Sequence, residues 1–316
     1  MKHSNPETVL VTGAAGNIGS ALARSLCADG RFRVIGVDDL STGSRHKLPP
    51  NDERFRFIKA DVNDFGEISA IFLSAPIRWV FHFAAVVGVQ RTLANPLKVL
   101  RDIDGIRHVL SLSKNGQVNR VYYSSSSEVY GEPVSLPQHE LVTPLNSRLP
   151  YAIVKNLGEA YFRSYYEEHG LQYTVFRYFN TYGPNQSDDF VIPKMLHAAM
   201  LGQPLTIYGD GRQTRTFCYI DDNVETMMRC LIEDHCINDV MNIGSDVEMT
   251  VLDLAHMIKR ITGSKSEIVH LPPLKEGDMT RRKPDITKMM EILRRPLVPV
   301  EEGITRLMAH WKATHA

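Results

Sequence analysis

The sequence predicts an α/β fold, with a parallel, doubly wound sheet followed by a smaller C-terminal α/β domain. Three observations support this expectation. Short runs rich in β-branched and aromatic residues alternate with helical patterns through the first half of the 316-residue chain, as in a sheet built from βαβ units. Several of these runs are apolar throughout, which is typical of strands buried on both faces. After about residue 178 the alternation stops, and Pro and Gly become frequent.

Each element follows from its own stretch of sequence. Residues of high β propensity cluster in six places, which predicts strands at residues 8–12, 33–37, 55–58, 79–83, 120–123 and 173–176. Helical patterns lie between them, over residues 17–29, 63–74, 97–114 and 150–169. We assign the first domain to residues 1–178, with 213–243 returning to its sheet, and the second domain to 179–212 and 244–316.

The charge balance argues against two classes of partner. Lys+Arg and Asp+Glu are both 36, so the formal net charge is zero. Since no basic excess is present, we expect neither nucleic acid nor an anionic membrane as a partner. No run approaches the roughly 18 apolar residues of a membrane span, and the first residues are polar rather than signal-like. These features predict a cytoplasmic protein.

The cysteines and histidines do not suggest a metal site. The chain has four cysteines, at positions 27, 218, 230 and 236, and none forms a C-x-x-C pair. The histidines show no zinc-like spacing. We therefore expect free thiols in a reducing compartment and no bound metal.

A glycine-rich turn predicts a cofactor site. The segment Gly13-Ala-Ala-Gly16-Asn17-Ile18-Gly19 follows the first predicted strand directly and opens the first helix. Glycines allow a tight turn and a close approach of backbone N–H groups to a pyrophosphate, while the helix N-terminus adds its dipole. In this strand–turn–helix context, the segment predicts a dinucleotide-binding domain of the Rossmann type.

Residues at the ends of the later strands indicate which dinucleotide binds. Asp38 ends the second predicted strand, where a carboxylate accepts a hydrogen bond from the adenosine ribose and repels a 2′-phosphate. This favours NAD over NADP. We expect Asp61 and Val62 beside the adenine ring, and Ala84 and Ala85 where small residues let the backbone pass the cofactor. The predicted NAD contacts are completed by Ser124, Tyr151 and Lys155.

Tyr151 and Lys155 lie four residues apart on the helix expected over 150–169. They therefore project from one face, one turn apart. An ammonium group beside a phenol favours the phenolate, so we expect the tyrosine pKa to fall from about 10 towards neutral. A phenol tuned in this way takes a proton from a sugar hydroxyl. The alternative is a surface helix that carries this spacing by chance.

The whole chain, from residue 8 to about residue 310, resembles the extended short-chain dehydrogenase/reductase superfamily. Within it, the resemblance is to the NAD-dependent nucleotide-sugar epimerase, dehydratase and decarboxylase branch, with features of UDP-glucose 4-epimerases and of UDP-glucuronate decarboxylases. The matching segments are Gly13–Gly19, Asp61-Val62, His82–Ala85, Ser124–Gly131, Tyr151–Lys155, Arg177–Pro184, Gly209–Arg215 and Tyr219–Asp222.

This resemblance implies a role for each matching residue. Ser126 would bond the substrate hydroxyl, Tyr151 would be the base, and Lys155 would hold the nicotinamide ribose. Three residues would bind the diphosphate of the nucleotide sugar, namely Asn180, Arg215 and Arg282; guanidinium groups suit this bidentate task. The resemblance also implies a homodimer that pairs through the helix bearing Tyr151 and the long helix before it.

The implied chemistry starts with oxidation at C4 of the sugar. The resulting 4-keto sugar is then re-reduced to the C4 epimer, decarboxylated if it is a uronic acid, or dehydrated, and NAD is recycled in each case. Glu128, after Ser127, resembles the decarboxylases and suits acid–base work near C5; otherwise it is a helix-start or pocket-rim residue. The segment Thr280–Asp285 also resembles the decarboxylases.

Other segments resemble epimerases, namely the predicted substrate contact Val86 with its loop to Gln90, and Ala152 after Tyr151. We therefore expect an NAD-dependent C4 epimerase that acts on a UDP-hexose or UDP-uronate. The main alternative is a UDP-glucuronate decarboxylase. A 4,6-dehydratase is less expected, and a non-catalytic NAD-binding protein is the least expected.

Overall fold

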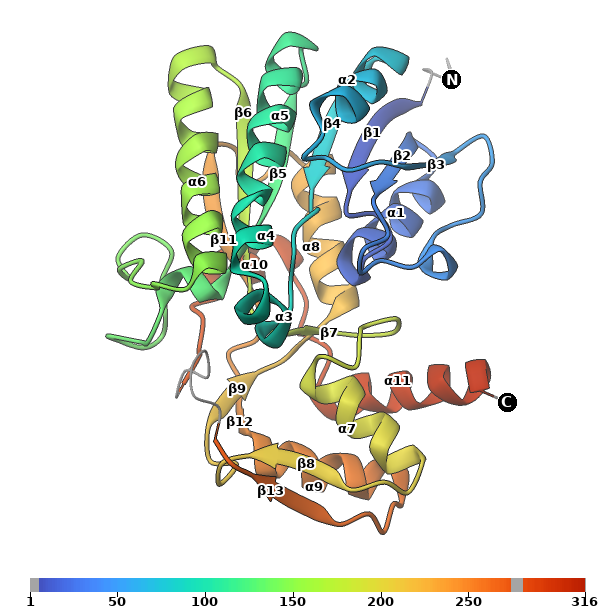
Figure 1. Ribbon diagram of the computed structural model, residues 1–316, viewed down its shortest axis with the longest axis vertical. Coiled ribbons are helices and arrows are strands. Elements are labelled where there is room, and N and C mark those ends of the chain that lie inside the picture. Colours follow the sequence, from blue (N-terminus) through green and yellow to red (C-terminus); the bar gives the residue numbers. More distant parts are fainter. Residues whose placement is uncertain (1–5, 274–280, 316) are drawn as a thin grey trace.

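The computed structural model describes residues 6–273 and 281–315. Its centre is a parallel seven-stranded sheet with the order β11-β6-β5-β4-β1-β2-β3 (Figure 1). The strands are β1 (Glu7–Thr12), β2 (Phe32–Asp38), β3 (Phe55–Lys59), β4 (Ile77–His82), β5 (Arg120–Ser126), β6 (Gln172–Tyr178) and β11 (Asp239–Ile243). The order reverses at β1, so the carboxyl ends of β1 and β4 diverge into helices on opposite faces and leave a crevice there.

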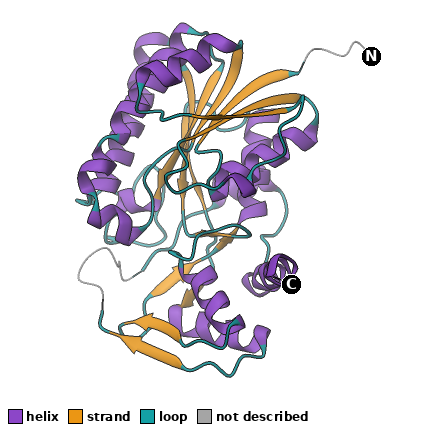
Figure 2. Ribbon diagram, turned by 45° about the vertical axis from the view of Figure 1, so that its right-hand side comes forward, coloured by secondary structure: helices purple, strands orange, loops and turns teal. Residues whose placement is uncertain are grey.

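Helices cover both faces of the sheet (Figure 2). One face carries α2 (Phe65–Ser74), α4 (Pro96–Leu100), α5 (Asp102–Asn115) and α6 (Pro150–His169), and the other carries α1 (Asn17–Asp29), α8 (Ile220–Ile232) and α10 (Thr287–Leu293). Successive residues of a strand bury alternate sides: Val9 and Val11 pack in one core, and Leu10 packs in the other. This arrangement confirms the doubly wound fold that the sequence predicts.

The expected elements of the first half occur with small shifts. The helix expected over 63–74 begins at Phe65, because the Asp64 side chain accepts a hydrogen bond from the Glu67 N–H at 3.0 Å and caps it. The helix expected over 97–114 is two segments, α4 and α5, and a short helix α3 (Val89–Ala94) precedes them. The seventh strand, β11, lies in the stretch expected to return to the sheet.

A second part of the chain lies below the carboxyl ends of the strands in Figure 1. It contains three two-stranded pairs: β7 (Thr181–Tyr182) with β10 (Cys218–Tyr219), β8 (Leu205–Tyr208) with β13 (Ile268–Leu271), and β9 (Thr214–Thr216) with β12 (Glu248–Thr250). Its helices are α7 (Val191–Met200), α9 (Val251–Thr262) and α11 (Val300–His315). This part therefore faces the crevice in the sheet.

Three further observations concern the described residues only. Within residues 6–273 and 281–315, no helix has the length and apolar character needed to cross a membrane. The four cysteines are unpaired. No group of three His, Cys, Asp or Glu side chains in the same ranges is arranged to hold a metal ion.

Candidate active site

A cavity of about 390 Å³ opens at the carboxyl ends of the central strands. Its walls come from the turn after β1, the loops after β2, β3, β4 and β5, the start of α6, and the segment after β6. The loop before α7 and the segment before α10 contribute lining residues from the second part of the chain. Both parts of the chain therefore line the cavity.

The glycine turn forms one end of this cavity. Gly13 has φ of +69°, and a Cβ atom there would lie 2.6 Å from the backbone of both Phe83 and Ala84. A Cβ atom on Gly19 would lie 2.2 Å from the Gly13 carbonyl oxygen. Such distances exclude any side chain at either position, so only glycine lets the turn, the loop after β4 and helix α1 meet. The N-terminus of α1 then faces the cavity, as a pyrophosphate site requires.

Asp38 stands at the wall beside this turn. It ends β2 and is only 8% exposed. Its carboxylate accepts hydrogen bonds from the Ala15 N–H at 3.0 Å and the Leu40 N–H at 2.8 Å. Burial raises the pKa of Asp38, against the two backbone donors that lower it. A carboxylate has lone pairs beyond these two bonds, so it can still accept a ribose hydroxyl.

The other predicted cofactor residues line the same cavity: Gly16, Asn17, Ile18, Asp61, Val62, Ala84, Ala85 and Ser124. The Asn17 side-chain oxygen is buried and has no hydrogen-bond partner among the described residues. An unsatisfied buried acceptor at the helix N-terminus indicates a ligand with a polar group there. These residues together fit NAD, the cofactor that the sequence predicts.

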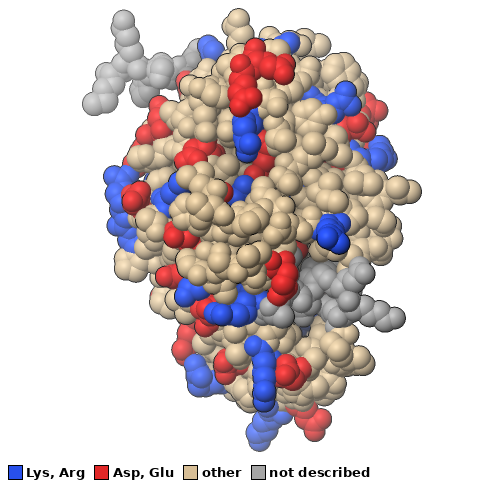
Figure 3. Space-filling model, turned by 90° about the vertical axis from the view of Figure 1, so that its left-hand side faces the viewer, with Lys and Arg blue, Asp and Glu red and all other residues tan. Residues whose placement is uncertain are grey.

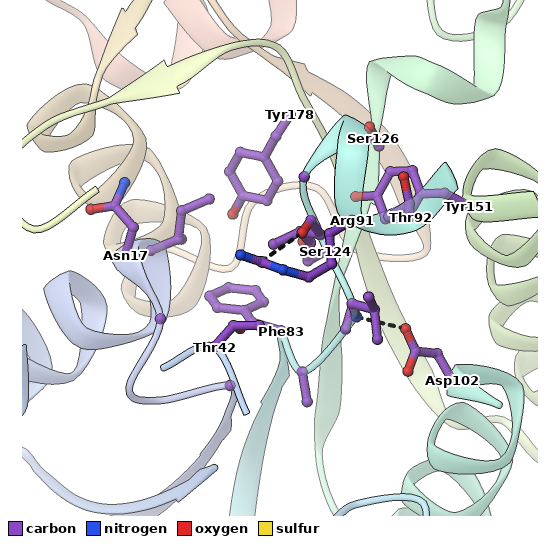
Figure 4. A pocket seen from close by; sticks show the side chains of 18 of the residues that line it. Asn17, Thr42, Phe83, Arg91, Thr92, Asp102, Ser124, Ser126, Tyr151 and Tyr178 are labelled. Carbon is purple, nitrogen blue, oxygen red and sulfur yellow. Dashed lines mark hydrogen bonds between the residues drawn. The ribbon is translucent and has the colours of Figure 1, made fainter. Parts of the chain in front are cut away.

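Ser126, Tyr151 and Lys155 meet where β5 ends and α6 begins. The Ser126 hydroxyl accepts a hydrogen bond from the Glu128 N–H at 3.2 Å, and both Ser126 and Tyr151 line the cavity. Figure 4 shows the Ser126 and Tyr151 side chains on one wall of the cavity. Lys155 is buried below them, where its ammonium donates to the Ser124 carbonyl at 2.6 Å and lies 5.7 Å from the Tyr151 ring centre. The three side chains are thus brought together.

The expected fall of the Tyr151 pKa is wrong for this structure. Burial raises that pKa above its ordinary value, because desolvation disfavours the phenolate, and the Glu128 and Asp102 carboxylates raise it further. The polar Ser126 side chain and the charge of Arg282 oppose this rise of the Tyr151 pKa. Burial also lowers the pKa of Lys155 to about 8. The Lys155 ammonium alone would favour the Tyr151 phenolate. Burial desolvates both groups and disfavours their charged forms.

The substrate end of the cavity holds a buried ion pair. Arg282 Nη2 lies 2.7 Å from Glu128 Oε1, and the two side chains are 7% and 12% exposed. Glu128 Oε2 and Arg282 Nε are each buried without a hydrogen-bond partner among the described residues. The predicted diphosphate-binding arginine is therefore held by the predicted acid–base residue, and both keep one polar atom for a ligand.

The other predicted substrate residues differ in their placement. Val86 and Asn180 line the cavity, although the Asn180 amide already donates to the Thr216 carbonyl at 3.0 Å. Arg215 lies on β9, is 8% exposed, and donates to the Thr214 carbonyl at 2.7 Å. It is not among the described residues that line the cavity. Thr280, at the start of the Arg282 segment, lies outside the described residues.

Sequence reasoning missed several lining residues, namely Thr42, Phe83, Arg91, Thr92, Asp102, Tyr178, Gln186 and Phe190. Arg91, on α3, donates to Asp189 at 2.5 Å and to the Val87 carbonyl at 3.0 Å. This ion pair joins α3 to the loop before α7. No short motif marks the pair, since its two residues are 98 positions apart.

Comparison with known proteins gives a consistent result. The model of the NAD dependent epimerase/dehydratase family matches residues 9–244. The chain is 34% identical to the UDP-N-acetyl-alpha-D-glucosaminuronate decarboxylase of Bacillus cytotoxicus, covering 93% of this chain and 94% of that protein. It is also 34% identical to UDP-glucuronic acid decarboxylase 6 of Arabidopsis thaliana, covering 94% and 86%. Among solved structures, the UDP-glucose 4-epimerase of Thermotoga maritima, determined with UDP-glucose, superposes with a TM-score of 0.92 at 32% identity, covering 98% and 100%.

Proposed function

The chain belongs to the NAD-dependent epimerase/dehydratase family, and we propose from this premise that it epimerises a UDP-sugar at C4 through a 4-keto intermediate. NAD is the cofactor of the family, and the family consists of enzymes that act on nucleotide sugars. The finer statements, namely the reaction, the sugar and the roles of single residues, are our proposals.

One observation carries the oxidation step. Ser126 and Tyr151 lie together on the wall of a cavity that is also lined by the glycine turn and Asp38. A nicotinamide bound from that turn and a sugar held near Arg282 would meet at this wall. The arrangement brings a proton acceptor to the same place as a hydride acceptor, as alcohol oxidation requires.

Tyr151 takes the proton of the C4 hydroxyl, and Ser126 holds that hydroxyl by hydrogen bonding. Bound NAD⁺ supplies the acceptor for the hydride that leaves C4. Lys155 keeps a positive charge beneath Tyr151 and so favours the phenolate. When the hydride returns, Tyr151 gives its proton back to the C4 oxygen, so the protein and cofactor end as they began.

Epimerisation requires that the 4-keto sugar presents its other face before the hydride returns. The lining of the cavity includes Val86, Val87 and Gly88, whose side chains offer no hydrogen bonds to a sugar ring. A weakly directional wall suits a ring that must turn. The likeness to the Thermotoga maritima 4-epimerase also supports this proposal.

Uronate decarboxylation is the second candidate, and the Glu128–Arg282 pair favours it. Both charges act on Tyr151, so both lie near the reacting end of the sugar. A guanidinium group there suits the C6 carboxylate of a uronic acid. Oxidation at C4 makes that acid a β-keto acid, which loses CO₂. Two of the relatives described above are decarboxylases of this kind.

Two other outcomes have less support. Position 127, where a dehydratase of the deoxythymidine type would carry Asp, is Ser127. A non-catalytic NAD-binding role is the least supported, since Ser126, Tyr151 and Lys155 are all present and lie together.

The deciding experiment supplies the protein with catalytic NAD and one of four substrates: UDP-glucose, UDP-N-acetylglucosamine, UDP-glucuronate or GDP-mannose. Products are separated and identified by mass and by NMR couplings of the sugar ring. We expect an unchanged mass with inverted coupling at C4. Loss of CO₂ from UDP-glucuronate would establish the second candidate instead, and loss of water would establish a dehydratase. No turnover of any sugar, with NAD bound, would refute the proposal.

We also propose a homodimer formed by the outer face of α4 and α6. Four large apolar side chains on these two adjacent helices are exposed, namely Leu97, Leu100, Ile153 and Leu157. Figure 3 faces this side of the molecule and shows broad uncharged surface between isolated charges. Light scattering during size exclusion tests the proposal, and Ile153→Glu should give the monomer. The expected cytoplasmic location stays a prediction.

A further inference from the structure

Asn242 is a buried polar residue near the end of β11. It is fully buried and is not among the described residues that line the cavity. Its Oδ1 accepts a hydrogen bond from the Tyr130 hydroxyl at 2.7 Å. Its Nδ2 donates to the Gln138 carbonyl at 2.9 Å and to the Asp285 carbonyl at 3.1 Å. One side chain therefore ties the turn after β5, the loop before α6 and the segment before α10 to the same strand.

An arginine fixes the direction of these hydrogen bonds. Arg177 on β6 donates from Nη1 to the Tyr130 hydroxyl at 2.9 Å, and a guanidinium group has no acceptor. The Tyr130 oxygen therefore accepts this bond and gives its own proton to Asn242, whose amide nitrogen is left for the two carbonyls. Arg177 is itself bound by Glu159 on α6, at 2.9 and 2.6 Å. A buried network with these bonds made holds its members rigidly.

One arm of this network reaches Glu128. Tyr130 ends the short 3-10 helix η2 (Ser127–Tyr130), whose second residue is Glu128. The bonds of the Tyr130 hydroxyl hold the end of this helix against β6 and β11. The Ser126 hydroxyl caps its start by accepting from the Glu128 N–H at 3.2 Å. The backbone that carries Glu128 is thus fixed at both ends.

The other arm reaches Arg282 through the segment that follows it. The Gln138 N–H donates to the Lys283 carbonyl at 2.7 Å, and the Asp285 N–H donates to the Gln138 carbonyl at 2.8 Å. The Asn242 amide adds its bonds to the Gln138 and Asp285 carbonyls. Arg282 directly precedes this paired segment and lies 2.7 Å from Glu128. Asn242 is therefore bonded to the segments on both sides of the ion pair.

We propose that Asn242 is a positioning residue: it sets the placement of Glu128 relative to Arg282, and thereby the affinity of the substrate end for a nucleotide sugar. The consequence for binding rests on the proposed function, in which Arg282 holds the nucleotide sugar. Since Asn242 lies outside the lining of the cavity, its effect on binding passes through the ion pair.

A double-mutant cycle tests this path. Asn242→Ala removes the three side-chain bonds, and we expect KM for the nucleotide sugar to rise about tenfold while NAD affinity stays unchanged. In an Arg282→Gln protein the ion pair is already absent, so the same substitution should raise KM no more than about twofold. An equal rise in both backgrounds would show that Asn242 acts on the fold as a whole, and would overturn the inference.

Thr174→Val is the matched control for lost stability. Thr174 lies on β6 opposite Asp239 of β11, is fully buried, and donates to the Cys236 carbonyl at 2.7 Å. Losing this bond should lower the midpoint of unfolding in urea and leave KM unchanged. If Thr174→Val raised KM as much as Asn242→Ala, lost stability would explain the effect and the positioning role would be wrong.

Tyr130→Phe decides the question if Asn242→Ala does not fold. It removes a single hydroxyl, and Arg177 Nη1 keeps its bond to the Glu140 carbonyl at 3.1 Å. We expect KM to rise about threefold in the wild-type background and to stay unchanged in the Arg282→Gln background. A wild-type KM, or the same rise in both backgrounds, would contradict the inference.

A readout without turnover separates this inference from the proposed function. Arg282 Nε is buried without a hydrogen-bond partner among the described residues, so burial slows the exchange of its proton with water. NMR of the ¹⁵N-labelled protein measures this exchange, with the signal assigned through Arg282→Lys. We expect exchange to become about tenfold faster in Asn242→Ala and faster in Tyr130→Phe, and to stay unchanged in Thr174→Val.

The two proposals can therefore fail separately. A wild-type protein that turns over no nucleotide sugar would refute the proposed function and leave the exchange measurement to decide the role of Asn242. Wild-type exchange rates in both Asn242→Ala and Tyr130→Phe would refute the inference even in an active enzyme.

Discussion

The two ends of the cavity differ in the atoms that form them, which are mainly backbone atoms at one end and side chains at the other. At the cofactor end, backbone atoms form the site: Gly13 packs against the main chain of Phe83 and Ala84, and two backbone N–H groups hold the Asp38 carboxylate. At the substrate end, side chains form the site, through the ion pair Glu128–Arg282. The path of the chain fixes the first end, whereas the second end depends on the identity of single side chains.

We propose that this difference separates what the reactions of the family share from what distinguishes them. Backbone atoms at the cofactor end keep their positions when most side chains are substituted, so this end serves any reaction that begins with removal of a hydride. Single substitutions alter the paired side chains at the substrate end, so we propose that this end selects the product. Variants that alter one end at a time test this division.

Tyr151→Phe removes the group that stands between the two ends. We expect turnover to fall about a thousandfold, the usual contribution of a general base, while NAD binding measured by calorimetry stays unchanged. Tyr166→Phe, at an exposed position of the same helix, is the control. A Tyr151→Phe protein with wild-type turnover would contradict the mechanism.

Gly13→Ala tests whether backbone alone makes the cofactor end. Since the added Cβ would lie 2.6 Å from the main chain of Phe83 and Ala84, we expect NAD binding to be lost. Gly170→Ala is the matched control, because Gly170 has φ of +70° but open space around its Cβ position. It should cost about 1 kcal/mol of unfolding free energy and leave NAD binding intact. Equal NAD affinity in both variants would show that the backbone packing at Gly13 does not form the cofactor site.

Arg282→Gln tests the substrate end. The substitution leaves Glu128 buried without its cation and removes a donor from the ligand, so we expect KM for the nucleotide sugar to rise roughly thirtyfold, equivalent to about 2 kcal/mol. NAD affinity should not change. Arg281→Gln is the control, since Arg281 forms a more exposed pair with Glu248 and such pairs contribute little. A change in NAD affinity with unchanged KM would reverse the assignment of the two ends.

The pH dependence gives the smallest effect near neutral pH. Burial lowers the pKa of Lys155 to about 8, so the ammonium form predominates below that pH and is lost as pH rises through it. NAD binding that depends on this charge should weaken as pH rises through about 8. Calorimetry of NAD binding between pH 6 and 10 measures this, because binding does not require the Tyr151 phenolate. An affinity that stays constant up to pH 10 would show that the cofactor does not need the ammonium.

Most residues predicted from the sequence for the cofactor line one cavity, because each of their segments is local. The glycine turn and Asp38 belong to one βα unit and its following strand, so hydrophobic runs and glycine spacing suffice to place them. The substrate end depends on contacts between distant segments. Nothing in the spacing of Glu128 or Arg282 indicates that they pair, and Arg215 on β9 is not among the described residues that line the cavity. The predicted fall of the Tyr151 pKa was wrong for a related reason. Desolvation of the phenol depends on burial by the whole fold, which the spacing of Tyr151 and Lys155 does not indicate.

The position of β11 determines when the edge of the sheet is completed during synthesis of the chain. β11 pairs with β6 through Asp239–Ile243, although the segments from β7 to α8 separate them in the chain. Domains fold as their residues leave the ribosome, so the outer edge of β6 stays unpaired until Ile243 has emerged. An open strand edge is a template for association with other chains. Nascent chains that stop before residue 239 should therefore be the ones that recruit chaperones, and those that extend past 243 should not.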